Sequence, residues 1–437
     1  MNAKPVLPRP RVVNPFTATL RTALAFLTVL AWSPITARAD VVLDWNLIAV
    51  KTLISQGQNP FAQARYMAIT QLAVFEAVNA ITGNYKPYIG TVVAPVDASV
   101  ETAAVAAAYG VLKAYFPGAD QLDTAYAASL ASVPDGSAKV AGIVTGKAAA
   151  AQMVALRVGD GSAPPEFYVP ESTTPGVWQT TPSCPAAGGI SYQWQNIQPF
   201  GAATELGNEG PWFDLFMPGP PPTLSSTRYA KDFEEVKTVG ALHSNERSQE
   251  RADVARFYAM SSPSLVFNLA ATQVAFAQGK SLSENARALA LLNMASSDSL
   301  VASFGTKYYY LFWRPETAIR AGSTDGNEKT DPDASFAPFI ATPCFPSYPS
   351  NHASASYSAA EIMRRLFGAG DHDITLANPA VPGVSLNYTT LKQITDDIDD
   401  ARVYGGIHFR FDQDAGGRLG RDVANFIYKH NLRRVND

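Results

Sequence analysis

Apolar residues recur along most of the chain at the spacing of three and four that places side chains on one face of a helix. Val105, Ala108, Leu112 and Phe116 follow this spacing, and so does the run from Ala288 to Ala295. Similar patterns predict further helices over residues 61–81, 139–157, 248–260, 352–367 and 391–404. No series of alternating apolar and polar residues indicates strands, and no internal repeat is found. The pattern therefore predicts an all-α fold.

The helical pattern stops between residues 159 and 226, where Pro, Gly, Ser, Thr and Trp predominate. The run Pro218-Gly219-Pro220-Pro221-Pro222 cannot hold a helix. Large aromatic side chains in this segment predict that it packs on the helices as an ordered connector or lid, and these are Trp178, Trp194, Phe200 and Trp212. We expect two helical bundles, an N-terminal half with this connector (residues 40–225) and a C-terminal half (residues 226–437).

The first 39 residues have the organisation of an export signal. They contain five basic residues and no acidic one, an apolar run from Ala23 to Trp32, a helix-breaking Pro34, and Ala37-Arg38-Ala39 before Asp40. A membrane anchor is the alternative, but about ten apolar residues are too few for a bilayer that needs about 20. No later stretch is long and apolar enough to span one. We expect cleavage after Ala39 and an exported, soluble protein that is periplasmic or secreted.

The composition excludes several classes of protein. With 47% hydrophobic and 16% charged residues the chain has ample material for a core, and its formal net charge of −4 argues against nucleic-acid binding. Two cysteines cannot form a disulfide scaffold or a cysteine-rich zinc site. In an exported protein Cys184 and Cys344 could form a disulfide or remain as two free thiols.

A first candidate for chemistry is the segment Lys307-Tyr-Tyr-Tyr-Leu-Phe-Trp-Arg314-Pro315. On a helix, a separation of seven residues places Lys307 and Arg314 within about 20° of each other, and Pro315 would mark the helix end. A solvated basic face is the usual setting of such a pair. The aromatic residues between them instead indicate a buried setting, in which two cations need an anionic partner.

A second candidate is Phe345-Pro-Ser-Tyr-Pro-Ser350-Asn351-His352, which precedes a predicted helix. Ser350 or Asn351 can cap that helix, so that backbone N–H groups and the helix dipole would bind an anion. A lone histidine in a first helical turn is usually structural or exposed. His352 would nevertheless lie beside any anion bound here.

The third candidate is Arg402-Val-Tyr-Gly-Gly-Ile-His408, followed by Asp412. A helix would separate Arg402 and His408 by about 120°, although Gly405-Gly406 could relax this. The alternative is a helix with scattered basic residues, and Asp412 could simply pair with a neighbour.

Together the three segments supply side chains suited to a tetrahedral oxyanion. Three cations can neutralise its charge, hydroxyl and backbone donors can fix its oxygens, one histidine can reach the central atom and the other can move a proton. These side chains are Lys307, Arg314, Ser350, His352, Arg402 and His408.

The order Lys-x6-Arg-Pro, Pro-Ser-x-His, Arg-x5-His resembles the vanadium-dependent haloperoxidases and the type 2 phosphatidic acid phosphatases, which share one fold. Pro175-Gly176-Val177-Trp178 and Gln198-Pro199-Phe200 are similar to the connector of bacterial haloperoxidase-like proteins. The helix around Ala73-Val74-Phe75-Glu76-Ala77-Val78-Asn79 is similar as well. The resemblance therefore runs through most of the chain after residue 39.

The resemblance implies a role for each motif residue. His408 would ligate vanadium, and His352 would be the acid and base that deprotonates hydrogen peroxide. Lys307 would also polarise the bound peroxide. The oxygens of vanadate would be held by Lys307, Arg314, Ser350, Arg402 and the backbone N–H of Asn351. Vanadate would then be the cofactor, with no need for haem, flavin or NAD.

The resemblance also implies the partners of the protein. Hydrogen peroxide, halide and small organic acceptors would be its substrates, and hypohalous acid its product. Neither nucleic acid nor a membrane span after signal removal is expected. Helical relatives often associate, so a homodimer is allowed, although no feature of the sequence indicates one.

The sequence departs from the family pattern at two positions. Asn351 replaces a glycine of the motif, and Ala401 replaces the serine before Arg402. Asn351 keeps a backbone N–H, but its bulk could narrow the pocket. Asp298 and Asp412 are candidates for the acid that often pairs with the last arginine in relatives.

Two other functions use the same residues. In an exported acid phosphatase, His408 would attack phosphorus to form a phosphohistidine and His352 would protonate the leaving alcohol. The aromatic residues around the three motifs favour a haloperoxidase over a phosphatase. A noncatalytic oxyanion-binding protein would need the cations but not both histidines. The remaining histidines, His243, His372 and His430, are interpreted as surface or structural residues.

The expected halide is bromide, with chloride as a second candidate. Phe345 lies seven residues before His352, where the resemblance implies Phe in fungal-type chloroperoxidases and His in algal bromoperoxidases. Phe345 is therefore the candidate residue of the halide pocket. Asn351 lies close to this pocket and its bulk could narrow it. Bromide oxidation is therefore the safer prediction.

Overall fold

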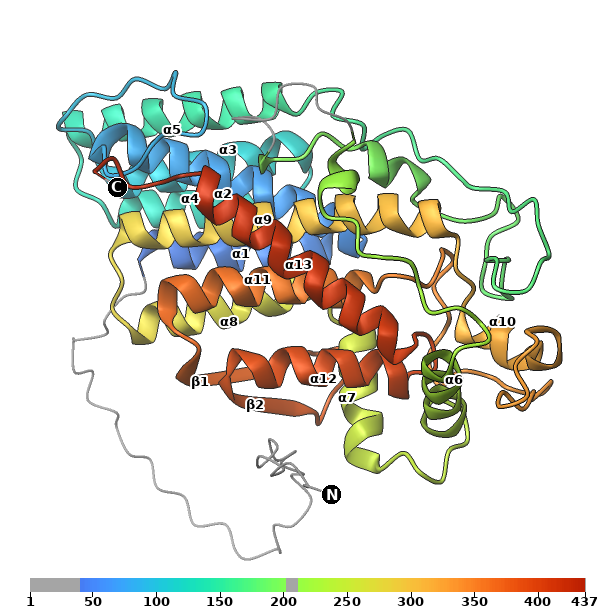
Figure 1. Ribbon diagram of the computed structural model, residues 1–437. Coiled ribbons are helices and arrows are strands. Elements are labelled where there is room, and N and C mark those ends of the chain that lie inside the picture. The colour runs from blue at the N-terminus through green and yellow to red at the C-terminus, as the bar shows by residue number, and fades with distance from the viewer. Residues whose placement is uncertain (1–39, 202–210, 437) are drawn as a thin grey trace, which may run out of the picture.

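The computed structural model describes residues 40–201 and 211–436, which form thirteen α-helices and one two-stranded sheet (Figure 1). The first five helices are α1 (Val41–Ser55), α2 (Pro60–Thr82), α3 (Val100–Tyr115), α4 (Gln121–Ala131) and α5 (Ser137–Leu156). The others are α6 (Thr227–Val239), α7 (Gln249–Ala259), α8 (Pro263–Ala277), α9 (Leu282–Tyr310), α10 (Pro315–Arg320), α11 (Asn351–Phe367), α12 (Leu391–Tyr404) and α13 (Arg410–His430). The predicted all-α class is confirmed. The expected export signal, residues 1–39, lies outside the described residues.

Side-chain caps fix where several helices begin. The Asp40 carboxylate accepts hydrogen bonds from the backbone N–H groups of Val42 and Leu43 at the start of α1. At the start of α9, Ser281 and Glu284 form a reciprocal capping box. These caps satisfy backbone donors that a helix start would otherwise leave without partners.

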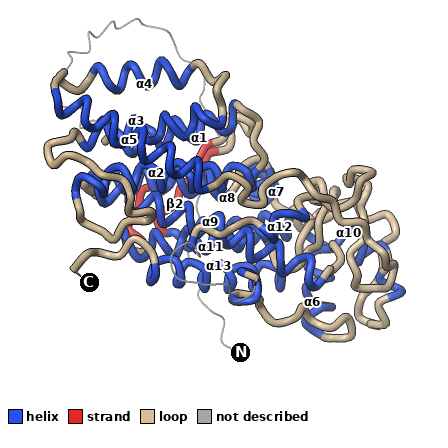
Figure 2. The backbone as a smooth tube through the Cα atoms, turned by 90° about the horizontal axis from the view of Figure 1, so that it is seen from above, coloured by secondary structure: helices blue, strands red, loops and turns tan. Residues whose placement is uncertain are grey.

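Helix α9 runs through the middle of the molecule. It packs against α2 on one side and against α11 and α13 on the other, and Figures 1 and 2 show it between the N-terminal and C-terminal helices. Most of its side chains are buried, and they include polar residues such as Asp298, Ser303 and Lys307. A helix that is buried all round can position polar groups only if other segments supply their partners.

Glycines in α13 allow this helix to approach α11 closely. A Cβ atom at Gly420 would collide with the carbonyl of Ser354, and one at Gly416 would come within 2.5 Å of the carbonyl of Ser350. The start of α11 is therefore held directly against α13. Both helices carry residues of the candidate site.

The segment between α5 and α6 packs on the helices through its aromatic residues. The side chains of Trp178, Trp194, Phe200 and Trp212 are all buried, as expected from the sequence. It contains only the short 3₁₀ helices η1 (Tyr192–Asn196) and η3 (Trp212–Leu215) in its described part. We call residues 159–226 the connector; the domain boundary at residue 225 stays a prediction.

Two long-range links fix the connector. The carboxylate of Asp298 on α9 accepts the backbone N–H groups of Phe200 and Gly201, at 2.8 and 2.7 Å. A disulfide joins Cys184 to Cys344 across 160 residues of sequence. Of the two states that the sequence left open for the cysteines, the structure has the disulfide.

The sequence did not predict the small sheet after α11. Strand β1 (Gly370–Ala377) pairs antiparallel with β2 (Ser385–Thr390), with Ile374 opposite Tyr388. Buried and exposed residues alternate along β1. The hairpin lies beside α12 and at a distance from α4 and α5 (Figure 1). Among the described residues, no helix is long and apolar enough to cross a membrane.

Candidate active site

Lys307 and Arg314 do not share a helix, contrary to the prediction. Helix α9 ends at Tyr310, because Leu311 adopts a left-handed conformation with φ of 50°. Arg314 lies beyond this break, immediately before Pro315 at the start of α10. The connector stabilises the break, since the backbone N–H of Trp178 donates to the carbonyl of Leu311 at 2.6 Å.

Both cations nevertheless meet at the segment around Phe345. The Lys307 ammonium donates to the carbonyls of Pro346 and Ser347, each at 2.8 Å, and Nε of Arg314 donates to the carbonyl of Phe345 at 2.8 Å. The Phe345 ring lies 5.2 Å from Nζ of Lys307 and 4.9 Å from Cζ of Arg314. The two cations are fully buried and orient this segment of backbone.

The second motif forms the start of α11. Ser350 is the N-cap, and its hydroxyl accepts the backbone N–H of Ala353 at 3.3 Å. Asn351 is buried, and its Oδ1 accepts the Ser303 hydroxyl at 2.7 Å. His352 follows in the first helical turn and remains partly exposed. The predicted helix start with its backbone donors is therefore present.

The third motif spans the end of α12 and the loop that follows. Arg402 lies in the last turn of α12, which Gly405 and Gly406 end, so that His408 lies outside the helix. Gly406 has φ of 79° and packs against Pro338, where a side chain would be strained. The glycine pair thus removes the 120° separation that a continuous helix would impose between Arg402 and His408.

His408 is held between an arginine and a carboxylate. Nη1 of Arg314 lies 3.0 Å from Nε2 of His408, and Oδ2 of Asp412 lies 2.8 Å from its Nδ1. Asp412 in turn accepts the Ser347 hydroxyl at 2.5 Å and the backbone N–H of Phe409 at 3.1 Å. A carboxylate can only accept, so Asp412 assigns the proton to Nδ1 and leaves the lone pair on Nε2.

The site contains more cationic side chains than carboxylates, and the pKa values of its residues reflect this shortage of negative charge. Burial and the neighbouring Arg314 lower the pKa of Lys307 well below its usual value, and burial lowers the pKa values of Arg314 and Arg402 to about 9. Burial and adjacent cations also hold the pKa values of His352 and His408 well below their usual range. Burial raises the pKa of Asp412 to about 6. An anion would favour the charged forms of all these cations.

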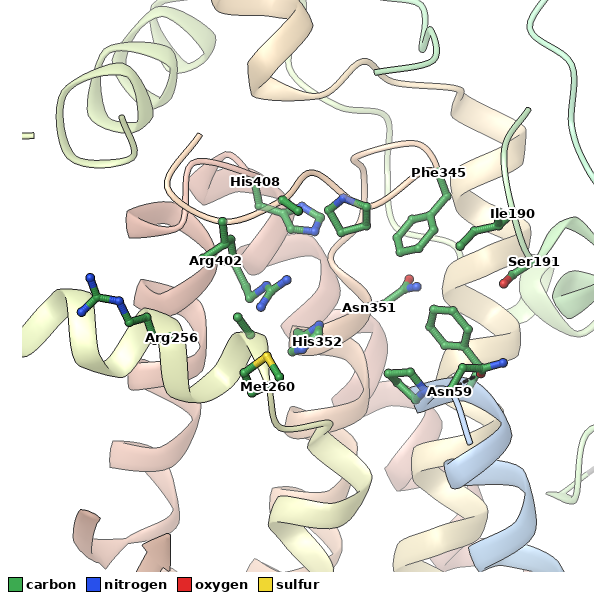
Figure 3. Close-up of a pocket in the computed structure, with 16 residues that line it drawn as sticks. Asn59, Ile190, Ser191, Arg256, Met260, Phe345, Asn351, His352, Arg402 and His408 are labelled. Carbon is green, nitrogen blue, oxygen red and sulfur yellow. Dashed lines mark hydrogen bonds between the residues drawn. The ribbon is translucent and has the colours of Figure 1, made fainter. Parts of the chain in front are cut away.

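The site opens into a pocket of about 610 Å³ (Figure 3). Its polar end is formed by Asn351, His352, Arg402 and His408. Its other walls are mostly apolar and include Pro60, Phe61, Ile190, Ala259, Met260, Ile340, Ala341, Pro343 and Phe345. Of the described residues, Lys307, Arg314 and Ser350 lie behind this lining.

Comparisons with known proteins agree with this geometry. Residues 287–437 match the family model of the VCPO second helical-bundle domain. This segment contains all three motifs. The crystal structure of the first bacterial vanadium-dependent iodoperoxidase is similar in fold, with a TM-score of 0.72 and 23% sequence identity, over 90% of this chain and 97% of that chain. The chain has the fold of the vanadium-dependent haloperoxidases.

Two further haloperoxidase structures share this fold. The apo form of a bacterial vanadium-dependent chloroperoxidase has a TM-score of 0.66 and 18% identity, over 85% of this chain and 95% of that chain. A holo form has a TM-score of 0.65 and 17% identity, over 85% and 92%. No curated protein sequence matches the chain. The predicted resemblance to vanadium-dependent haloperoxidases is confirmed.

Vanadate fits the residues present. Among the buried N–H donors of the described residues that have no hydrogen-bond partner, two belong to the cations of the motifs, namely Nη2 of Arg314 and Nε of Arg402. The Lys307 ammonium uses two of its three donors on carbonyls and keeps the third. Unpaired buried donors are costly unless a ligand accepts from them. No group of three or more His, Cys, Asp or Glu side chains among the described residues could hold a bare metal ion. The donors suit an oxyanion.

The acid that was expected to pair with the last arginine is not where the sequence suggested. Asp298 binds the connector and Asp412 binds His408, whereas Nη1 of Arg402 donates to the carbonyl of Tyr258 at 3.2 Å. Sequence reasoning missed this carbonyl, because no sequence signal identifies a backbone acceptor.

Sequence reasoning also missed the role of Ser347, which anchors Asp412. In the sequence, the only indication of this role was the position of Ser347 within the second motif.

The histidines outside the motifs lie away from the pocket. His243 is exposed, His372 is buried with a ring nitrogen 3.2 Å from the carbonyl of Gly368, and His430 stacks on Phe426. These positions agree with their interpretation as surface or structural residues.

Proposed function

We propose that this protein is a vanadate-dependent haloperoxidase that oxidises bromide, and secondarily chloride, with hydrogen peroxide. Halide, hydrogen peroxide and one proton give hypohalous acid and water. The observation that carries the proposal is the pair of buried, unpartnered donors on Arg314 and Arg402, with Arg314 also in contact with Nε2 of His408. The haloperoxidase fold supports peroxide-dependent halide oxidation in general terms.

The chain's own residues would hold the cofactor. His408 would be the ligand through Nε2, because Asp412 occupies Nδ1. The oxygens would be bound by Lys307, Arg314, Ser350, Arg402 and the backbone N–H of Asn351. Bound vanadate supplies a Lewis acid that activates peroxide without a change in oxidation state, so haem, flavin and NAD are not needed.

His352 is the proposed base. Its imidazole is neutral at neutral pH, because burial and the charge of Arg402 lower its pKa. The backbone of Tyr258 opposes this lowering, because it favours a proton on one ring nitrogen. The other ring nitrogen then carries a lone pair that can accept a proton from hydrogen peroxide and return it to a leaving oxygen.

Phe345 is the proposed wall of the halide site. Its ring lines the pocket and lies against both Lys307 and Arg314. The two buried cations would attract a halide, and the apolar ring beside them would exclude water that competes for it. Lys307 spends two of its three N–H groups on carbonyls, and the third would polarise the peroxide.

The deciding experiment measures two activities on the same samples. Bromide and chloride oxidation by hydrogen peroxide is followed before and after loading with orthovanadate, together with phosphate-ester hydrolysis. We expect halide oxidation only after loading, and its loss in His408→Ala. His430→Ala is the matched control, since it removes an imidazole outside the pocket and should leave activity unchanged.

Other outcomes would assign other functions. Phosphate-ester hydrolysis without vanadate, inhibited when vanadate is added, would identify an exported acid phosphatase that uses the same side chains. Vanadate binding that survives in His408→Ala, with neither activity in the wild type, would identify an oxyanion-binding protein. Either result would overturn the haloperoxidase proposal.

We further propose that the protein is exported, to the periplasm or beyond. The basic and apolar character of residues 1–39 supports this, and the Cys184–Cys344 disulfide is typical of oxidising compartments. Mass analysis of protein recovered outside the cytoplasm should give a chain that begins at Asp40. A cytoplasmic protein that retains residue 1 would contradict export.

A further inference from the structure

The pocket is much larger than halide oxidation requires. A volume of about 610 Å³ lies in the range of sites that enclose organic ligands of drug size, about 300–1,000 Å³. Peroxide and halide are each comparable to one or two water molecules, which occupy about 30 Å³ apiece. Most of the pocket is therefore free for a further ligand.

The walls define what that ligand must be. They are mostly apolar, and Phe61 and Phe345 pack edge to face on one side, with ring centroids 5.9 Å apart at 67°. Phe61 is fixed from behind by Phe304, at 4.7 Å. Rigid aromatic walls of this kind favour a flat, apolar molecule over a charged or flexible one.

One polar group lies where the apolar walls meet the catalytic end. The Asn351 amide is buried, and the Ser303 hydroxyl donates to its Oδ1, which fixes the orientation of the amide. Its Nδ2 has no hydrogen-bond partner among the described residues. Figure 3 shows this amide between His352 and the side chain of Phe345. A ligand oxygen placed here would satisfy the donor.

We propose that this pocket binds the organic acceptor of the halogen, and that the acceptor is a neutral, flat phenol-type compound whose oxygen accepts a hydrogen bond from Nδ2 of Asn351. The inference rests on the proposed function, which supplies hypohalous acid. In the transfer step an electron-rich ring carbon forms a bond to the halogen as the oxygen–halogen bond breaks. The ring proton and the released hydroxide then give water.

The binding test uses the full protein without vanadate or peroxide, so it does not depend on the proposed activity. The probes are 2-naphthol and naphthalene, which differ by one hydroxyl group. We expect 2-naphthol to bind roughly three- to tenfold more tightly, the effect of one hydrogen bond to a buried donor. Asn351→Leu should remove this preference. Equal affinity of the wild type for both probes would overturn the role of Asn351.

Variants of the wall test the location. Ala259 and Ala341 line the pocket and are exposed, so a larger side chain there extends into the pocket and not into the core. Ala341→Trp should weaken 2-naphthol binding at least about tenfold by filling space. Val96→Trp is the matched control, because Val96 is 96% exposed on a loop away from the pocket. Unchanged binding in both Ala259→Trp and Ala341→Trp would overturn the proposed site.

Product analysis separates a held acceptor from diffusing hypohalous acid. The ratio of brominated isomers formed by the vanadate-loaded enzyme is compared with the ratio from added hypobromous acid. We expect different ratios for the wild type, and a return toward the free-acid ratio in Ala341→Trp. Identical ratios in the wild type would show that halogen transfer occurs outside the pocket. Absence of halide oxidation would instead refute the proposed function, while the binding result would still stand.

Discussion

Oδ2 of Asp412 lies 2.8 Å from Nδ1 of His408, and Nη1 of Arg314 lies 3.0 Å from Nε2 of the same ring. The carboxylate of Asp412 keeps the ring proton on Nδ1. The N–H of Arg314 points at Nε2, which therefore carries the lone pair. His408 is thereby oriented before any cofactor binds.

Asp412→Asn should weaken vanadate binding about ten- to a hundredfold, the usual effect of losing a partner behind a metal-ligating histidine. The amide can donate to Nδ1 and so move the ring proton to Nε2, where it would block ligation. Vanadate affinity is measured by titration of the purified protein. Asp414→Asn is the control, because Asp414 lies on the same helix but pairs with Arg228 at the surface. Equal affinities in the two variants would contradict this account.

Phe345→His should lower chloride oxidation relative to bromide oxidation by roughly tenfold, since a change of about 1–2 kcal/mol in the pocket corresponds to this factor. The variant replaces an apolar ring against Lys307 and Arg314 with a hydrated polar one, and chloride is the more strongly hydrated halide. The ratio of kcat/KM values for the two halides is the measurement. Phe167→His, on an exposed site of the connector, should leave the ratio unchanged. An unaltered ratio in Phe345→His would reject this residue as the halide determinant.

Asp298 should make stability depend on pH. Burial raises its pKa to about 7 from the ordinary value of 3.8, although the N–H groups of Phe200 and Gly201 oppose this. The folded chain then binds a proton that the unfolded chain has lost, so the free energy of unfolding falls as pH rises from about 4 to about 7, by at most about 1.4 kcal/mol per pH unit. Urea unfolding at several pH values should show a weaker fall in Asp298→Asn than in the wild type.

The same variant tests the link between α9 and the connector. Asparagine can accept only one of the two backbone N–H groups, so Asp298→Asn should lower the free energy of unfolding by about 1–3 kcal/mol at neutral pH. Asp214→Asn, at an exposed site in η3, is the control and should have little effect. Equal stability of both variants at every pH would show that Asp298 does not hold the connector.

Removal of the disulfide should destabilise the fold. Because the bridge closes a loop of 160 residues, the double variant Cys184→Ser, Cys344→Ser should lose about 2–4 kcal/mol of unfolding free energy. Urea unfolding of the double variant is compared with that of the wild type in oxidising and in reducing buffer. The reduced wild type should resemble the variant, and a variant as stable as the oxidised protein would contradict the prediction.

Local pattern sufficed to predict seven of the thirteen helices in the described residues, but not α1, α4, α6, α8, α10 and α13. The predicted helix over residues 391–404 coincides with α12, and that over 352–367 differs from α11 by one residue. Apolar periodicity and the cap at Ser350 contain this information, because a helix that buries one face reveals that face in its spacing. The motif residues were also proposed from sequence, since their types and order suit an oxyanion; their roles stay predictions.

Contacts between segments that are distant in the sequence could not be predicted from local sequence patterns. The break at Leu311 depends on hydrogen bonding with Trp178 in the connector, so spacing wrongly placed Arg314 on the helix of Lys307. The hairpin was missed because the buried alternation in β1 is short. The disulfide partners are 160 residues apart, and the pairing of Asp412 with His408 depends on a loop whose path the sequence does not specify.

Helix α9 bears Asp298, which holds the connector, and Lys307, which is one of the residues proposed to bind the oxyanion. Nine residues of rigid helix separate them, about 14 Å along the axis. The connector and the proposed oxyanion site are therefore linked through one rigid helix. A chimeric chain that took residues 159–226 from a structural relative would have to keep a carboxylate at position 298, because a poorly seated connector would displace the helix that presents Lys307.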